Sequence, residues 1–120
     1  AHQYIDEAIP RVAQMGAMQH LLGSSHIDIE GNTAYVETYV WTFVRFQDDD
    51  KDIDTFTGGR LMDRFEKRGG EWKIAHRWTI LDWNRDTPST EGWCLGLFDF
   101  SQKGARAGLK GKEDPSYERF

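Results

Sequence analysis

Cysteine, proline and basic residues are all scarce in this sequence. Its 120 residues include one cysteine and three prolines, and 15 Lys and Arg stand against 20 Asp and Glu, which gives a net charge of −5. The lone Cys94 excludes an internal disulfide and suits a reducing compartment, so we expect a cytoplasmic protein and a structural thiol. The acidic balance argues against nucleic acid as a partner, because a nucleic-acid-binding protein needs a basic face to neutralise phosphates.

Long apolar runs are missing too. No run approaches the ~20 residues needed to span a bilayer, and the first residues show no signal-peptide pattern. We therefore expect no membrane partner. A phosphate-binding glycine loop, a GxGxxG pattern and a Ser nucleophile elbow are also absent, which leaves nucleotide and acyl-transfer chemistry without support.

Metal-binding patterns are equally scarce. There is no HExxH motif, and the four His have no carboxylates at ligand spacing. The acidic run 47–54 lacks the Gly and the closing Glu of a calcium-binding loop, so we interpret it as a solvated loop. We interpret His26 and His76 as core or interface residues, the latter sharing a strand face with Ile74, Trp78 and Ile80. The sequence predicts neither a metal nor a cofactor.

What the sequence does contain is a change of apolar period near residue 20. Apolar residues at three- and four-residue spacing predict a helix over 2–19, which Pro10 should kink or split. From His20 the period is two, and Gly31-Asn32 predicts a hairpin turn after Ile29. Further strands are predicted over 33–46, 55–67 and 71–83, with a turn at 68–70.

The order of these elements predicts one α+β domain, residues 1–120, with a helix, a four-stranded antiparallel meander and an irregular tail over 84–120. The apolar cluster 93–100 in that tail should pack on its own domain or on a neighbour, whereas the Gly- and Lys-rich patch near 103–112 reads as an exposed tail.

The strand predicted over 33–46 is apolar on both faces. One face carries small and aliphatic residues, the other mostly aromatic ones: Ala34, Val36, Thr38, Val40, Thr42 and Val44 against Tyr35, Glu37, Tyr39, Trp41, Phe43 and Arg45. Neither face suits water, so the sheet should be covered twice, by helices on one side and by another subunit on the other. We expect a homo-oligomer, either a dimer or a trimer.

Three segments, residues 19–34, 59–66 and 70–83, together resemble the SnoaL-like family of the nuclear transport factor 2-like superfamily. The closing Asp114-Pro115-Ser116-Tyr117 also resembles that group. The resemblance implies a cone: a strongly curved antiparallel sheet packed on N-terminal helices, as in cystatin-like folds, around a deep apolar pocket. Family members begin with two more helices and a short strand, so we expect an N-terminal part to be missing here.

The same resemblance singles out His20. In scytalone dehydratase and bile acid dehydratase, which this segment resembles, a His at the matching place is the general base, and imidazole titrates near neutral pH. The Asp that orients it would lie in the missing N-terminal part. The alternative is a His satisfied by a backbone carbonyl at a strand end. Those dehydratases also place a His or an Asp in the middle of the long strand, but positions 42–44 hold Thr, Phe and Val here, which weakens the case for the same dehydration.

Arg60 and Arg77 are the candidate anion-binding residues. A guanidinium that points into the cone would stabilise a carboxylate, a phenolate or an enolate. The alternative is cross-strand ion pairing, of Arg60 with Asp63 or Glu66 and of Arg77 with Asp82 or Glu71.

These residues predict a cofactor-independent lyase or isomerase that carries out dehydratase-like proton transfer on a hydrophobic aromatic or polycyclic small molecule. His20 is the predicted catalytic residue, and the predicted substrate-binding residues are Leu22, Tyr39, Trp41, Thr42, Arg60, Met62 and Arg77. The resemblance favours the face with Thr38 and Val40 as the pocket wall, which would place Tyr35, Tyr39 and Trp41 in an oligomer interface. Catabolism of aromatic compounds, lignin-derived ones included, is a setting suggested by analogy. The alternative is a non-catalytic ligand-binding or assembly module, like the small subunit of ring-hydroxylating dioxygenases.

Overall fold

The computed structural model describes residues 2–48, 51–99 and 106–118. The chain separates into two compact units, Ala1–Ser89 and Thr90–Phe120. The first unit carries every candidate residue named above, and each unit is described by itself. Among the described residues, no helix is long and apolar enough to cross a membrane.

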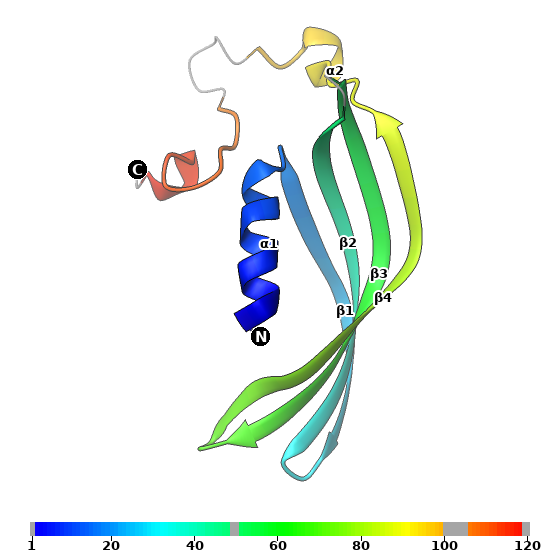
Figure 1. The fold of residues 1–120 in the computed structure, drawn as a ribbon, viewed down its shortest axis with the longest axis vertical. Helices are drawn as coiled ribbons and strands as arrows, with labels where there is room; N and C mark the ends of the chain where they lie inside the picture. Colours follow the sequence, from blue (N-terminus) through cyan, green and yellow to red (C-terminus); the bar gives the residue numbers. More distant parts are fainter. Residues whose placement is uncertain (1, 49–50, 100–105, 119–120) are drawn as a thin grey trace. The chain divides into compact units, whose positions relative to one another are not determined.

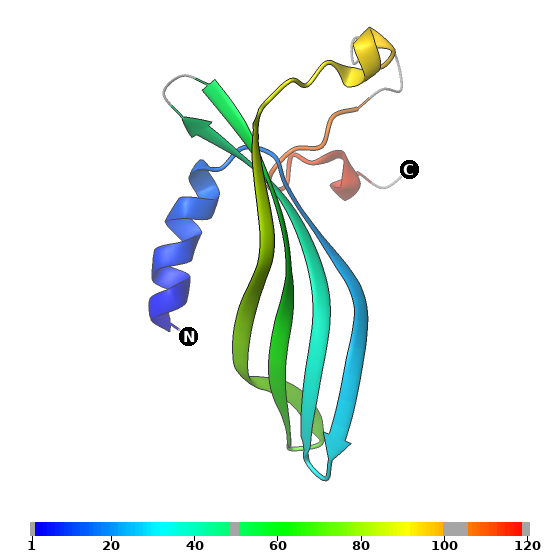
Figure 2. The ribbon, with the colours of Figure 1, turned by 90° about the vertical axis from the view of Figure 1, so that its right-hand side faces the viewer.

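The first unit is built around four antiparallel strands that follow one another in sequence order (Figure 1). They are β1 Met18–Glu30, β2 Thr33–Asp48, β3 Lys51–Arg68 and β4 Glu71–Pro88. The β1–β2 and β3–β4 turns lie at the same end of the sheet (Figure 2), and their Gly31, Gly69 and Gly70 have φ of 59°, 60° and 85°. Such φ values are easy only for glycine, which explains why both turns form there. The predicted α+β class and the order of a helix followed by a four-stranded meander are confirmed.

Helix α1, His2–Gln14, is shorter than predicted and runs through Pro10 as one element. It ends early because the chain begins to pair with β2: the Gly16 N–H donates to the Arg45 carbonyl at 2.9 Å, and the Arg45 N–H donates to Ala17 at 2.8 Å. On α1, Ile9 remains 62% exposed. The predicted packing of the sheet on N-terminal helices is therefore absent from the described chain.

The acidic run is part of a long hairpin, so its interpretation as a loop was wrong, although residues 47, 51 and 52 are exposed to solvent as expected. Asp48 pairs with Lys51 across the β2–β3 ladder. Asp54 accepts two hydrogen bonds from the Arg45 guanidinium, at 2.7 and 3.0 Å. The facing opposite charges of Arg45 and Asp54 thus favour strands that run beyond their predicted ends; residues 49–50 lie outside the described part.

Side chains alternate between two faces of the sheet, which we name after β2. The aliphatic face carries Ala34, Val36, Thr38, Val40, Thr42 and Val44 and the residues registered with them; the aromatic face carries Tyr35, Glu37, Tyr39, Trp41, Phe43 and Arg45 and theirs. The buried side chains of the described chain all lie on the aliphatic face: Ala34, Thr38, Val40 and Asp63. The aliphatic face is therefore the better packed of the two.

The register shifts at three irregularities, between Leu22 and Ser25, Gly58 and Gly59, and Arg64 and Phe65. Each shift changes which neighbours share a face, because one extra residue reverses the alternation. Simple alternation placed His20 with His26, but the β1 shift puts His20 on the aliphatic face and His26 on the aromatic one. The shift between Arg64 and Phe65 likewise places Ile74 and His76 of β4 on opposite faces, whereas the sequence predicted that they share one.

The predicted strongly curved cone is not what the structure shows, because the four strands twist together without curling strongly (Figures 1 and 2). Large apolar side chains stay exposed on both faces, among them Leu22 at 62% and Trp78 at 67%. Helix α1 does not pack against either face to bend it.

The C-terminal unit contains α2, Trp93–Gly96, and a 3-10 turn, η1, Pro115–Tyr117. Asp114 caps η1, since its carboxylate accepts the N–H of Ser116 at 2.9 Å and of Leu109 at 2.7 Å. The apolar cluster predicted to pack is exposed in its described part, with Leu95 and Leu97 fully or largely accessible. Phe100 of that cluster, and residues 103–105 of the basic patch, lie outside the described residues.

Candidate functional site

His20 stands at one end of a polar row that crosses the aliphatic face. It pairs with Thr42 on β2, Thr42 pairs with Thr57 on β3, and Thr57 pairs with Asn84 on β4. The Thr57 hydroxyl donates to the Asn84 side-chain carbonyl at 2.7 Å. His20 itself is exposed on the edge strand, so a ligand lying on this face has access to its imidazole.

The next row along the same face is apolar. Leu22 pairs with Val40, and Leu81 of β4 belongs to the same row across Gly59. Leu22 and Leu81 are 62% and 73% exposed. An apolar surface beside a few polar groups is the composition of most small-molecule sites. Of the predicted site residues, His20, Leu22 and Thr42 are brought together here.

Arg77 also lies on the aliphatic face but far from His20. Its Nε and Nη2 donate to the two carboxylate oxygens of Asp63 at 2.6 and 2.7 Å. The predicted partners, Asp82 and Glu71, were wrong, because Asp63 faces Arg77 directly in the register. Asp63 is six residues beyond Thr57 on β3, which corresponds to about 20 Å of strand. Arg77 and His20 therefore do not converge on one small ligand in this arrangement.

Arg60 lies on the opposite, aromatic face and is held by two carboxylates. Its Nε and Nη2 donate to Asp82 at 3.0 and 2.9 Å, and its Nη1 donates to Glu37 at 3.1 Å. The predicted partners, Asp63 and Glu66, were wrong, because the irregularity at Gly58 and Gly59 presents Asp82 instead. These hydrogen bonds, chiefly those that Arg60 donates to Asp82, raise the pKa of Arg60, and the same contact lowers the pKa of Asp82.

Tyr39, Trp41 and Met62 share the aromatic face with Arg60. Trp41 meets Trp83 edge to face, with ring centroids 5.5 Å apart. The two rings meet across Gly58, which registers with both and has no side chain to separate them. The predicted substrate-binding residues are thus divided between two faces, and no single ligand on one face reaches all of them.

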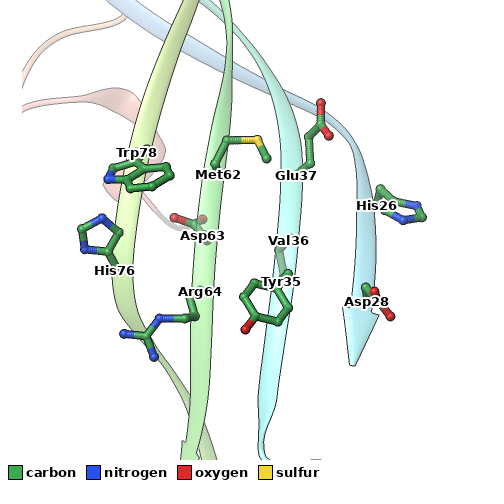
Figure 3. A pocket seen from close by; sticks show the side chains of 10 residues that line it. All are labelled: His26, Asp28, Tyr35, Val36, Glu37, Met62, Asp63, Arg64, His76 and Trp78. Carbon is green, nitrogen blue, oxygen red and sulfur yellow. The ribbon is translucent and has the colours of Figure 1, made fainter. Parts of the chain in front are cut away.

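The aromatic face also carries a groove of about 470 Å³ that the sequence pattern did not predict (Figure 3). All four strands contribute to it, and its lining is His26, Asp28, Tyr35, Val36, Glu37, Met62, Asp63, Arg64, His76 and Trp78. Asp28, Tyr35, Arg64 and His76 form one cross-strand row. The signal in the sequence was the alternation of His26 and Asp28, but its meaning depends on a register that spans four strands.

Charges in this groove are largely matched by neighbours. Arg64 is paired with Glu66, and Glu37 is engaged by Arg60. The His76 ring packs edge to face on Trp78 at 5.2 Å. Over the described part of the chain, no three His, Cys, Asp or Glu side chains come together as a metal site.

Comparison with protein families decides the relationship of this chain. The family model described as a SnoaL-like domain matches residues 1–78. The chain belongs to the SnoaL-like domain family. The family lies in the nuclear transport factor 2-like superfamily, as the sequence resemblance predicted.

Solved structures agree on the fold of this SnoaL-like chain. The Kfla4162 protein from Kribbella flavida matches with a TM-score of 0.61 at 11% identity, over 70% of this chain and 59% of that one. A "Putative Scytalone Dehydratase" from Novosphingobium aromaticivorans matches with a TM-score of 0.59 at 20% identity, over 70% of this chain and 56% of that one. This chain therefore spans less than two thirds of either structure. A search of curated proteins finds no match.

Proposed function

We propose that this SnoaL-like protein is a cofactor-independent lyase or isomerase that acts on a hydrophobic aromatic or polycyclic small molecule, with His20 as its general base. The observation that carries the proposal is the position of His20 on the aliphatic face, next to the apolar row of Leu22 and Val40. Membership of the SnoaL-like family and a fold like that of the Novosphingobium protein support it.

The proposed role of His20 is proton transfer alone. Its imidazole takes the proton from a carbon beside a carbonyl group, and the electrons of the broken C–H bond form a carbon–carbon double bond. In a lyase, hydroxide leaves from the neighbouring carbon and receives the proton back from the imidazolium, so that water is the second product. In an isomerase, the proton returns to a different carbon. Neither route needs a cofactor.

The test is turnover by the full-length protein of an aromatic β-hydroxy ketone, followed through the ultraviolet absorbance of the conjugated product. His20→Ala should lower kcat by about a hundredfold or more, the usual contribution of a general base. Gln19→Ala is the matched control, because Gln19 is next to His20 on the same edge strand but on the aromatic face. Equal loss in both variants would attribute the effect to the strand rather than to the imidazole and would sink the proposal.

A second candidate function is a non-catalytic assembly module. The large exposed rings of the aromatic face favour it, with Tyr39 at 55%, Trp41 at 61% and Trp78 at 67%. We propose that this face joins copies of the chain into a dimer or trimer, which is compatible with catalysis on the other face. Trp78→Glu should then dissociate the oligomer in sedimentation experiments. If it does so while the wild-type protein shows no turnover, assembly alone is the function.

A further inference from the structure

The far end of the polar row has hydrogen-bonding groups that the proposed proton transfer does not use. Thr57 donates to the Asn84 carbonyl oxygen at 2.7 Å, and the Asn84 Nδ2 donates to Asp86 at 2.9 Å. Two hydrogen bonds therefore fix the orientation of the Asn84 amide. A side-chain amide has two N–H donors and a hydroxyl also accepts, so Asn84 keeps a second N–H and Thr57 keeps acceptor capacity, both exposed or half-buried on the aliphatic face.

A ligand hydroxyl group matches the remaining hydrogen-bonding capacity of Asn84 and Thr57. A ligand hydroxyl both donates and accepts, so it can donate to the Thr57 oxygen and accept from the Asn84 N–H at once. A carbonyl group can use only the Asn84 donor, and a carboxylate would meet the charge of Asp86 beside it. The pair therefore selects an alcohol or a phenol over an acid.

The spacing between the two ends of the row sets the size of the ligand. Neighbouring strands lie about 4.8 Å apart, so Thr57 is about 10 Å and Asn84 about 14 Å from His20 across the sheet. Only Thr42 intervenes on this row, and the adjacent row offers Leu22, Val40 and Leu81 as an apolar surface. A single six-membered ring is too short for this span, whereas two linked rings match it.

We infer that Thr57 and Asn84 form a hydroxyl-binding subsite, and that the ligand of this face is a two-ring apolar compound with a hydroxyl group at the end remote from His20. The inference rests on the proposed function for the role of His20, but the subsite itself is a binding claim. Thr57 and Asn84 orient the ligand and take no part in proton transfer.

The experiment compares para-phenylphenol with biphenyl by equilibrium dialysis against the full chain. The hydroxylated probe should bind about fivefold more tightly if it gains one net hydrogen bond and about thirtyfold if it gains two. Thr57→Val and Asn84→Leu should each lower the ratio of the two dissociation constants by about fivefold, and the double variant should bring it close to one. Thr79→Val, a matched change on the same face of β4 beside Leu61, should leave the ratio as it is. Denaturant unfolding of each variant should show that it remains folded.

Nuclear magnetic resonance tests the span. The two-ring phenol should shift the signals of both the His20 imidazole and the Asn84 side-chain amide, whereas para-cresol should shift those of Asn84 alone. A wild-type protein without preference for the hydroxylated probe, or one whose preference survives both substitutions, overturns the inference. His20→Ala should keep the preference while turnover is lost. If turnover persists in His20→Ala while the wild-type protein prefers the hydroxylated probe, the proposed function fails and the subsite stands. If turnover is lost in His20→Ala but the wild-type protein shows no such preference, the subsite fails and the proposed function stands.

Discussion

Replacing Gly59 by alanine tests the β3–β4 register on which every face assignment depends. Gly59 is buried and pairs with Leu81 at the irregularity that brings Asp82 to Arg60. A Cβ atom added to Gly59 would lie 2.3 Å from the Ile80 carbonyl oxygen and 3.6 Å from the Leu81 Cα. Because the nearest atom belongs to the backbone of the neighbouring strand, no side-chain rotation relieves the clash.

The cost follows from that geometry. An added methyl group in a packed site costs about 1–3 kcal/mol when the surroundings give way, and here the strand itself must move. We expect Gly59→Ala to lower the free energy of unfolding by about 3 kcal/mol, at the upper end of that range. A chain of this size then loses about 10 °C in Tm.

Gly58→Ala and Gly23→Ala calibrate the result. At Gly58 the added Cβ would lie 2.3 Å from the Trp83 ring, which can turn away at the cost of its contact with Trp41, about 1 kcal/mol. At Gly23 the nearest atoms are 3.5 Å away, an ordinary contact, so alanine should be neutral or slightly stabilising. Urea unfolding followed by circular dichroism measures all three. A Gly59→Ala protein as stable as wild type would refute the register.

Three further predictions concern the ion pairs and a cap. The hydrogen bond from Arg45 holds the pKa of Asp54 below the ordinary value of 3.8. The stabilisation that this ion pair gives the fold is therefore present above pH 3.8 and is lost as the pH falls below that value. Asp54→Asn should flatten the acid limb of a plot of unfolding free energy against pH. Arg77→Met should lower the free energy of unfolding in urea by about 2 kcal/mol, because it leaves the carboxylate of Asp63, whose side chain is 4% exposed, without its ion-pair partner. The 44% exposure of Arg77 makes this loss smaller than for a fully buried pair. The double variant Arg77→Met, Asp63→Leu should recover most of the lost stability. Asp114→Ala should raise the hydrogen-exchange rate of the Ser116 amide, which the capping carboxylate holds, and an unchanged rate would contradict the cap.

The number and order of the elements in the first unit could be predicted because each is a local pattern. The alternation around Val36 and the turn glycine Gly31 determine the β1–β2 hairpin within a few residues. The strand ends could not be predicted, because the charged residues at positions 45–54 are attractive only once they face one another. A run of Asp residues looks solvated until Arg45 is known to lie opposite Asp54.

The candidate site was harder to predict than the fold. The role of His20 rests on a resemblance, and its neighbours depend on one irregularity between Leu22 and Ser25. Two irregularities in the β3–β4 register change which carboxylates the arginines bind. Arg77 donates to Asp63 and Arg60 donates to Asp82, whereas the sequence predicted other pairs. Single extra residues of this kind leave no periodic signal, which is why period-two reasoning placed His20 with His26, and Ile74 with His76, on shared faces.

The most direct test of the aliphatic face as the site is a crystal structure of the full-length protein with para-phenylphenol bound. We predict the ligand on the aliphatic face, with one ring beside the His20 imidazole and the hydroxyl group between Thr57 and Asn84. A ligand seated in the groove of the aromatic face, against Trp78 and Tyr35, would contradict the assignment of the site.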